Sequence, residues 1–447
     1  MNILFISMAG DALSIAQRVQ QEGHNSLLYI CDKQAKHVGD RMVEKPHTLA
    51  PVMTEEKHKV LKGNVLMLLK ETQPDLVVFD MVKMGEVADY VKEQHIPVFG
   101  ACKWADYAEL DRDYGYKLMK SVGIKTPVTY VFNASEREKA ISMVEKSKKR
   151  YVYKPSGNIE CSHTYVSKGT EDMVAMLKVW SKDGCEFELQ EYIEGVLVSA
   201  EIWWNGQSAG MHNWTMEEKK FMAAPIDEDI EKVTSIPKDG VGSTVGCAGD
   251  VVSFLSSSKK LVKEGIGRME RLLKKTNYRG PIDLNSIVTK EGIYGLEFTI
   301  RLGYDAVQPL LELYKGSITS LLYAIATGSD KKGEIYGGVA IGVRISIPPY
   351  PHTEKEVVSD IPIIGTNAEN LKHIWWADVK AGSEYYESAG VDGNLGCVTA
   401  KGSDVRECRR RVYRTISNLT IPQLQYRTDI GNRVDGDVTK LKDWGYL

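Results

Sequence analysis

Residues 280–309 read GPIDLNSIVTKEGIYGLEFTIRLGYDAVQP, and this stretch decides the fold of the chain. Apolar and polar residues alternate over 281–288 and again over 293–301, which predicts two β-strands. The segment between them, TKEG, is typical of a turn because it ends in glycine. The stretch is therefore predicted to form a β-hairpin whose strands carry unexpected polar side chains.

Four polar residues stand on this hairpin, Asp283, Asn285, Glu297 and Arg301. Because side chains alternate along a strand, Asp283 and Asn285 share one face. Glu297 and Arg301 share a face of the second strand for the same reason. Buried carboxylates are costly unless they are paired or bind a metal, and Mg²⁺ takes oxygen ligands of this kind beside nucleotide phosphates. Two interpretations stay open, a magnesium site or a salt bridge within a buried sheet.

The length and charge of the whole chain limit the class of protein. A chain of 447 residues is too long for one hydrophobic core, so we expect roughly two to four domains. The net charge of −3 and the isoelectric point near 6.4 give no overall field that attracts nucleic acid or an anionic membrane. The sequence also has no signal-peptide pattern and no run of eighteen apolar residues. We expect a soluble cytoplasmic protein.

The cysteines support the same compartment. Their number is odd and no C-x-x-C pair occurs, which favours reduced thiols in a cytosol over a disulfide framework or a zinc site. The seven positions are 31, 102, 161, 185, 247, 397 and 408.

The pattern of predicted elements divides the chain. Strands and helices alternate through the first hundred residues, which predicts a doubly wound parallel sheet, although its first turn lacks the G-x-G-x-x-G of a dinucleotide site. A mixture of strands and helices follows, including long helices expected at 107–123, 258–275 and 310–328. The polar segment 329–334 is the best candidate linker. The remainder indicates a mainly β domain with one covering helix.

Lys154 is the first candidate for a nucleotide site, because no Walker motif is present. It ends the predicted strand YVYKPS and precedes a loop, and a later strand carries Gln190. A lysine in this position can reach phosphate oxygens while the amides of the loop cover them. The alternative is an ordinary solvated lysine at a strand end.

The order and spacing of these motifs resemble the phosphoribosylamine–glycine ligase family of the ATP-grasp superfamily along nearly the whole chain. The segments that carry the resemblance are IPVFGACKWADYAELDRDYGYKLMKSVGIKTP, LQEYIEG, GLEFTIRLGYDAVQP, GCVTAKGSDVRECRRRVY and RTDIGNR. The last two are typical of this family's C-terminal domain. The resemblance implies an α/β and α+β multidomain fold: an N-terminal α/β domain at 1–100, an ATP-grasp domain at 101–328 with a lid at about 124–193, and a small mainly β C-terminal domain at 335–447.

The resemblance also implies roles for individual residues. ATP would be held by Arg112 and Lys154 at the phosphates and by the backbone of Gln190, Glu191, Tyr192 and Ile193 at the adenine. Mg²⁺, or Mn²⁺ in its place, would be held by Glu297, Asn285 and Asp283. Arg301, Lys219 and Lys220 would lie near the reaction centre.

The implied reaction is the ATP-dependent joining of a carboxylate to an amine, as in purine biosynthesis. Glycine is the first candidate acid, phosphoribosylamine is one candidate amine, and a monomer or homodimer is expected. Several residues depart from the family pattern, namely Ser162, Leu197, Thr299, Tyr304 and Ala306, and the loop MAGDALS lacks the family's basic residues. The same chemistry on a different amine or amino acid therefore stays open, as does a nucleotide-binding protein without catalytic activity.

Overall fold

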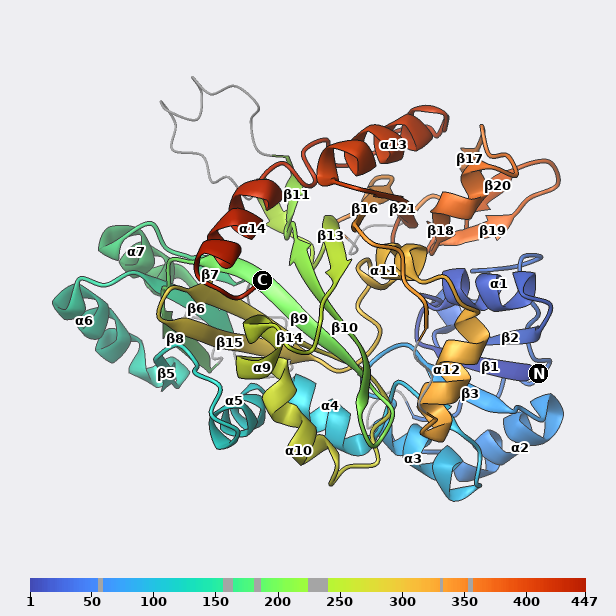
Figure 1. Cartoon of the computed structure of the whole chain (residues 1–447), viewed down its shortest axis with the longest axis horizontal. Helices are drawn as coiled ribbons and strands as arrows, with labels where there is room; N and C mark the ends of the chain where they lie inside the picture. Colours follow the sequence, from blue (N-terminus) through green and yellow to red (C-terminus); the bar gives the residue numbers. More distant parts are fainter. Residues whose placement is uncertain (55–58, 156–163, 181–185, 224–239, 330–332, 353–356) are drawn as a thin grey trace.

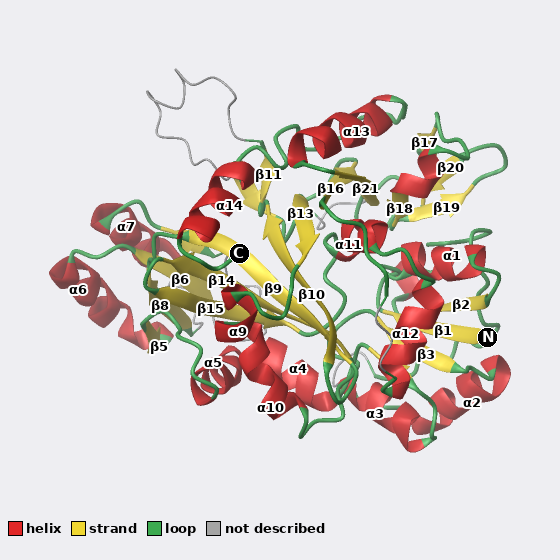
Figure 2. Ribbon diagram, viewed as in Figure 1, coloured by secondary structure: helices red, strands yellow, loops and turns green. Residues whose placement is uncertain are grey.

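A computed structural model describes residues 1–54, 59–155, 164–180, 186–223, 240–329, 333–352 and 357–447 (Figure 1). None of the helices in these segments has the length and apolar character that a membrane span requires. The five cysteines within them are free thiols. Figure 2 shows helices packed around several separate sheets.

The N-terminal region is a parallel four-stranded sheet in the order β2-β1-β3-β4. Two buried clusters cover its faces, one that includes α1 and one that includes α2 and α3. The predicted doubly wound sheet is therefore confirmed. The chain leaves β1 toward β2 on one side and reaches β3 on the other, so the strand order reverses between β1 and β3. The strands are β1 (Asn2–Ser7), β2 (Asn25–Ile30), β3 (Leu76–Phe79) and β4 (Val98–Phe99), and the helices are α1 (Leu13–Gln21), α2 (Lys62–Thr72) and α3 (Gly85–Glu93).

A second four-stranded sheet, here called the lid sheet, has the order β5-β8-β6-β7. One of its faces packs against α6 (Arg137–Ser147) and α7 (Thr170–Trp180) in a separate small core. The other face points away from these two helices. Its strands are β5 (Thr129–Phe132), β6 (Tyr151–Pro155), β7 (Tyr165–Val166) and β8 (Phe187–Glu191).

The largest sheet has eight strands in the order β15-β14-β9-β10-β13-β16-β21-β18. All its pairings are antiparallel. The sheet runs across the linker expected at 329–334, because β13 pairs with β16 directly. Its strands are β9 (Val196–Trp204), β10 (Ala209–Glu217), β13 (Gly249–Phe254), β14 (Gly280–Thr289), β15 (Gly292–Thr299), β16 (Val339–Ser346), β18 (Ile374–Trp376) and β21 (Asn394–Gly402).

Smaller elements surround this sheet. A two-stranded ribbon and a three-stranded sheet lie beside it, and α13 packs on β16 and β21. The predicted covering helix of the C-terminal region is confirmed as α13. These elements are β11 (Lys220–Met222), β12 (Val241–Thr244), β17 (Pro362–Ile363), β19 (Val379–Ala381), β20 (Tyr386–Ser388), α13 (Val405–Ser417) and α14 (Val434–Asp443).

Three helices expected to be continuous are broken, so these predictions were wrong. The first divides into α4 (Lys103–Leu110) and α5 (Arg112–Ser121), because Asp111 is extended and accepts a hydrogen bond from the N–H of Tyr114 as the cap of α5. The second divides into α9 (Lys260–Glu264), the 3₁₀ turn η4 (Ile266–Met269) and α10 (Glu270–Leu273) at Gly265, whose ψ of −120° is not helical. The third divides into α11 (Val307–Leu313) and α12 (Ile318–Thr327), where Tyr314 is extended.

The hairpin of β14 and β15 is confirmed, with one difference. Asn285 lies directly opposite Glu297, and a bulge beside this pair leaves Leu296 without a partner. The second strand ends at Thr299, two residues earlier than predicted. Arg301 therefore lies beyond the strand, so the alternation that placed it on the face of Glu297 does not reach it.

Candidate active site

The inner face of the lid sheet carries the first polar group of the site. Tyr151 and Tyr153 of β6 point into the small core beneath α6 and α7, so Lys154 points to the opposite face. Strand β8 alternates in the same sense and places Glu188 and Gln190 on this face, with Glu188 in register with Lys154. Figure 1 shows the lid sheet beside β14 and β15, with α6 and α7 on its outer side.

Lys154 is a buried cation. Its residue is 9% exposed, and burial lowers the pKa of its ammonium to about 8 although the charge of Glu297 acts in the opposite direction. Within the segments that the structure describes, the ammonium makes no hydrogen bond or ion pair. A buried charge without a partner is costly, so this position is suited to an anionic ligand.

Arg112 brings a second cation to the same place. Its Nη1 donates to the carbonyl oxygen of Pro155 at 2.8 Å and lies 3.8 Å from Oε2 of Glu188. Burial raises the pKa of Glu188, against the charges of Arg112 and Lys154. Glu188 was missed by the sequence analysis, although the alternation of FELQEYI places it on the same face as Gln190.

The hairpin supplies the opposing wall. Lys219 places its Nζ 3.1 Å from Oδ1 of Asn285 and 3.6 Å from Oε1 of Glu297. Burial alone would raise the pKa of Glu297, but Lys219 and Lys154 outweigh it and the pKa is lowered. Glu297 is therefore an ionised carboxylate, and its side chain is 49% exposed. Of the residues expected near a metal, Asn285 and Glu297 are thus brought together, with Lys219 between them.

Asp283 completes this wall. Its Oδ2 accepts a hydrogen bond from Nδ2 of Asn285 at 3.2 Å, whereas its buried Oδ1 has no partner among the described residues. Burial raises its pKa well above the ordinary value, and the charges of Glu201 and Glu217 add to this effect. Asp283 therefore holds an oxygen whose hydrogen-bonding capacity is unused.

The side chains of Lys220 and Arg301 form hydrogen bonds with residues outside this group. Nζ of Lys220 lies 3.3 Å from the hydroxyl of Thr244, and Nε of Arg301 donates to Oε1 of Glu109 at 3.0 Å. In the part of the chain that is described, neither side chain bonds Lys154 or Glu297. Their assignment to the reaction centre stays a prediction.

The expected adenine hinge follows β8. Nε2 of Gln190 donates to the hydroxyl of Tyr116 at 2.8 Å, which fixes the side chain between the lid sheet and α5. The backbone N–H groups of Glu191 and Tyr192 already donate to carbonyls of neighbouring segments. A base at this position would therefore have to use carbonyl oxygens or the N–H of Ile193.

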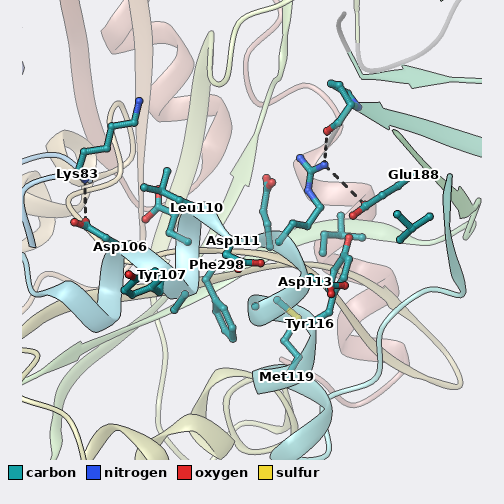
Figure 3. Close-up of a pocket in the computed structure, with 18 of the residues that line it drawn as sticks. Lys83, Asp106, Tyr107, Leu110, Asp111, Asp113, Tyr116, Met119, Glu188 and Phe298 are labelled. Carbon is teal, nitrogen blue, oxygen red and sulfur yellow. Dashed lines mark hydrogen bonds and ion pairs between the residues drawn. The ribbon is translucent and has the colours of Figure 1, made fainter. Parts of the chain in front are cut away.

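A cavity of about 830 Å³ lies beside these groups and is lined largely by residues of α4, α5, β8 and β15. Arg112, Glu188 and Glu297 line it, and Figure 3 shows Tyr116 beside Glu188 at one end and Lys83 at the other. This volume lies within the range of small-molecule sites. The cavity is thus lined by the cation Arg112 and by the carboxylates Glu188 and Glu297, whereas Lys154, Asn285 and Asp283 are not among its lining residues.

No family model matches the chain. Curated proteins do: the phosphoribosylamine–glycine ligase of Leptospira interrogans is 26% identical over 388 residues, which are 83% of this chain and 86% of the relative. The enzyme of the same name from Lactococcus lactis is 23% identical over 363 residues, 78% of this chain and 81% of the relative. The chain resembles phosphoribosylamine–glycine ligase. This similarity confirms the relationship predicted from the motifs.

Solved structures agree on the fold. The phosphoribosylamine–glycine ligase of Thermotoga maritima superposes with a TM-score of 0.69 at 18% identity, covering 96% of this chain and all of that one. A biotin carboxylase from Campylobacter jejuni gives a TM-score of 0.64 at 12% identity, covering 99% and 96%. At these identities the likeness establishes the ATP-grasp fold alone, so the fold class predicted from the sequence is confirmed.

Two departures from the phosphoribosylamine–glycine ligase pattern lie on the hairpin and on the neighbouring strand β9. Thr299 is in register with Asp283, and Leu197 stands on β9 in register with Ile287 of the hairpin. Ser162 lies outside the described residues. The departures at Tyr304 and Ala306 lie beyond β15, on the side of the N-terminal sheet.

Proposed function

We propose that this chain is an ATP- and Mg²⁺-dependent ligase that joins the carboxylate of a small amino acid, glycine first, to an amine. The observation that carries the proposal is the pair of cations, Lys154 and Arg112, on the wall opposite Glu297 and Asn285. Phosphate groups would satisfy the unpaired ammonium of Lys154. The curated relatives, which are named as ligases, support the reaction class.

The proposed reaction consumes only the acid, ATP and the amine. A carboxylate oxygen of the acid attacks the terminal phosphorus of ATP, ADP leaves, and an acyl phosphate forms. The nitrogen of the amine then attacks the acyl carbon, the C–O bond to phosphate breaks, and the nitrogen loses a proton. Lys154 and Arg112 would stabilise phosphoryl charge.

The donor set of the hairpin fits Mg²⁺. Mg²⁺ is usually held by one or two carboxylates together with substrate phosphates, and Glu297, Asn285 and the unused oxygen of Asp283 supply such ligands. No group of three or more His, Cys, Asp or Glu residues in the described segments forms a dedicated metal cage. When bound here, the metal would neutralise phosphate charge.

The decisive experiment supplies ATP, Mg²⁺ and glycine with a panel of amines that includes phosphoribosylamine, and follows ADP release and product mass. We expect ADP release that depends on both acid and amine, and we expect Glu297→Gln to abolish it while the circular dichroism spectrum stays unchanged. Lys139→Ala, on the exposed outer side of the lid, serves as the control. Near-normal turnover in Glu297→Gln would contradict the metal assignment.

A second candidate is a nucleotide-binding protein without turnover. Leu197 and Thr299 favour it, because they replace polar residues of the family pattern on β9 and β15. ATP binding without ADP release for any acid would support this candidate.

A further inference from the structure

The C-terminal region reaches the candidate active site through two arginines. Arg427 and Arg433 are the first and last residues of the segment RTDIGNR, and α14 begins directly after Arg433. Both arginines bond the chain at residues 217–220, where β10 ends and β11 begins. Figure 1 shows α14 beside β11. Two segments that are distant in the sequence are therefore joined on either side of Lys219.

Arg433 holds the chain before Lys219. Its Nε donates to Oε1 of Glu218 and its Nη2 donates to the carbonyl oxygen of Glu217, each at 2.7 Å. Its Nη1 donates to Oδ2 of Asp437 in the first turn of α14 at 3.2 Å. The planar guanidinium thus bonds a side chain and a backbone carbonyl at the same time, through a fork of donors that lysine does not possess.

Arg427 holds the chain after Lys219. Its Nη1 donates to the carbonyl oxygen of Lys220 at 2.8 Å, while its Nε and Nη2 donate to the two carboxylate oxygens of Asp429 at 2.8 and 2.7 Å. Arg427 is 2% exposed, and Glu218, whose Oε2 lies 3.5 Å from its Nη2, is 4% exposed. Bidentate arginine–carboxylate bonds fix the geometry of both partners, so this side of Lys219 is held as well.

Lys219, between these two contacts, extends its side chain to the hairpin. Its carbonyl oxygen accepts the N–H of Val245 at 2.9 Å, which adds a third restraint on the backbone. Its Nζ lies 3.1 Å from Oδ1 of Asn285, 3.4 Å from Oε2 of Glu217 and 3.6 Å from Oε1 of Glu297. Catalytic groups have to be held within about 0.5 Å of their productive geometry by the residues around them. The placement of this ammonium therefore depends on bonds that the C-terminal region makes.

We propose that Arg433 and Arg427 are positioning residues, which align the ammonium of Lys219 with Glu297 and with the phosphate that ATP transfers. The C-terminal region then completes the active site. This inference rests on the proposed function for the role of Lys219 in turnover, whereas the alignment of Lys219 can be tested without turnover. The alternative is that the two arginines only stabilise the junction of β10 and β11.

Arg433→Lys is the informative variant. It keeps the positive charge beside Glu218, which preserves the fold, but it cannot bond Glu218 and the carbonyl of Glu217 together. We expect kcat for ADP release to fall at least about tenfold while KM for ATP stays within about threefold, because Lys154 and Arg112 are untouched. Unchanged kcat would overturn the inference.

Arg411→Lys is the matched control. Nη1 of Arg411 likewise donates to a carbonyl oxygen, that of Lys401, at 2.7 Å, and Nη2 pairs with Oε1 of Glu407 at 2.6 Å. This arginine belongs to α13 rather than to the segment that bonds β10 and β11. The control should therefore keep both kinetic constants, and a fall in kcat equal to that of Arg433→Lys would count against a specific role for Arg433.

A double-mutant cycle separates positioning from a purely structural role. If Arg433 acts through Lys219, Arg433→Lys should lower kcat no further in a Lys219→Met background. A fall by the same factor in both backgrounds would overturn the inference, because Arg433 would then act independently of Lys219.

The alignment of Lys219 can also be followed without catalysis. Acetylation of the full chain with sulfo-N-hydroxysuccinimide acetate, followed by peptide mass spectrometry, reports how accessible each lysine ammonium is. We expect Arg433→Lys to raise the acetylation rate of Lys219 severalfold and to leave that of the exposed Lys139 unchanged. An unchanged rate at Lys219 would overturn the inference. If the rate rises but the unaltered protein releases no ADP with any acid and amine, the alignment stands and the ligase function fails.

Discussion

At the scale of single residues, the ammonium of Lys154 and the carboxyl group of Asp80 are both buried. Among the described residues, the buried ammonium of Lys154 makes no hydrogen bond or ion pair, and the buried Oδ1 of Asp80 has no hydrogen-bond partner. Burial of the Lys154 ammonium costs free energy, and a bound phosphate would remove that cost, whereas burial raises the pKa of Asp80 and favours its uncharged form. Lys154 therefore leads to predictions about ATP turnover and affinity, and Asp80 leads to a prediction about the pH dependence of folding stability.

Lys154→Ala should lower kcat/KM for ATP by the equivalent of about 2–4 kcal/mol, because it removes one electrostatic donor from a closed site. The measurement is steady-state ADP release, compared with Lys139→Ala. A value within about threefold of the unaltered protein would mean that Lys154 is only a solvated strand end.

ATP affinity should also depend on pH through Lys154. The ammonium, whose pKa is about 8, is charged below that pH and loses its proton above it. The dissociation constant of ATP should therefore rise as the pH passes from 7 to 9. Lys154→Arg keeps its charge over this range, so its ATP affinity should be nearly flat. A parallel rise in both proteins would assign the titration to another group.

Asp80 should make folding stability fall with rising pH. Burial, with the charge of Asp11, raises the pKa of Asp80 to about 7 from an ordinary 3.8. The stabilising contribution of the protonated form is fully present below pH 3.8 and is lost as the pH rises through 7. Asp80→Asn should thus increase the free energy of unfolding more at pH 8 than at pH 5, as measured with urea. An equal difference at both pH values would contradict the raised pKa.

At the scale of elements, sequence periodicity identified strands better than helix ends. The hairpin of β14 and β15, which carries Glu297, was predicted because polar and apolar residues alternate along it, and β6, which carries Lys154, was predicted in the same way. The breaks at Asp111 and Gly265 were missed because an apolar pattern continues through both, although a capping aspartate and a glycine were visible signals. The pairing of Arg301 with Glu109 could not be predicted, because it joins segments 192 residues apart.

The break between α4 and α5 gives a prediction at this scale. Asp111 accepts the N–H of Tyr114 at 2.9 Å and so caps the helix that begins with Arg112. Asp111→Ala should destabilise the protein by about 1 kcal/mol, measured by chemical denaturation. Asp113→Ala in the same turn, with its exposed side chain, should cost less. Equal losses would argue against the cap.

At the scale of the whole molecule, one sheet unites regions that the sequence pattern separates. Strand β13 pairs with β16 across the polar segment 329–334, and no local pattern reveals such a pairing between distant strands. The domain boundaries drawn from the sequence stay a prediction about evolutionary units, while the hydrogen bonds define a larger physical unit.

A chain that ends at residue 328 should therefore fail to fold stably. It would expose the edge of β13 and the apolar side chains that now pack against β16 and β21. The expected result is an aggregated or protease-sensitive fragment, assessed by size-exclusion chromatography and limited proteolysis. A monomeric, protease-resistant fragment would show that the pairing of β13 with β16 is dispensable.

The order of the strands in the eight-stranded sheet also determines when the sheet can form during translation. All strands of the parallel N-terminal sheet lie before residue 100, so this sheet can form while the rest of the chain is still being translated. The central sheet cannot close until β21 has emerged, because β21 joins β16 to β18. The strands from β9 to β15 must therefore wait, with an unpaired edge at β13, until β16 (Val339–Ser346) has been translated. Chaperone dependence of this protein should concentrate in that interval.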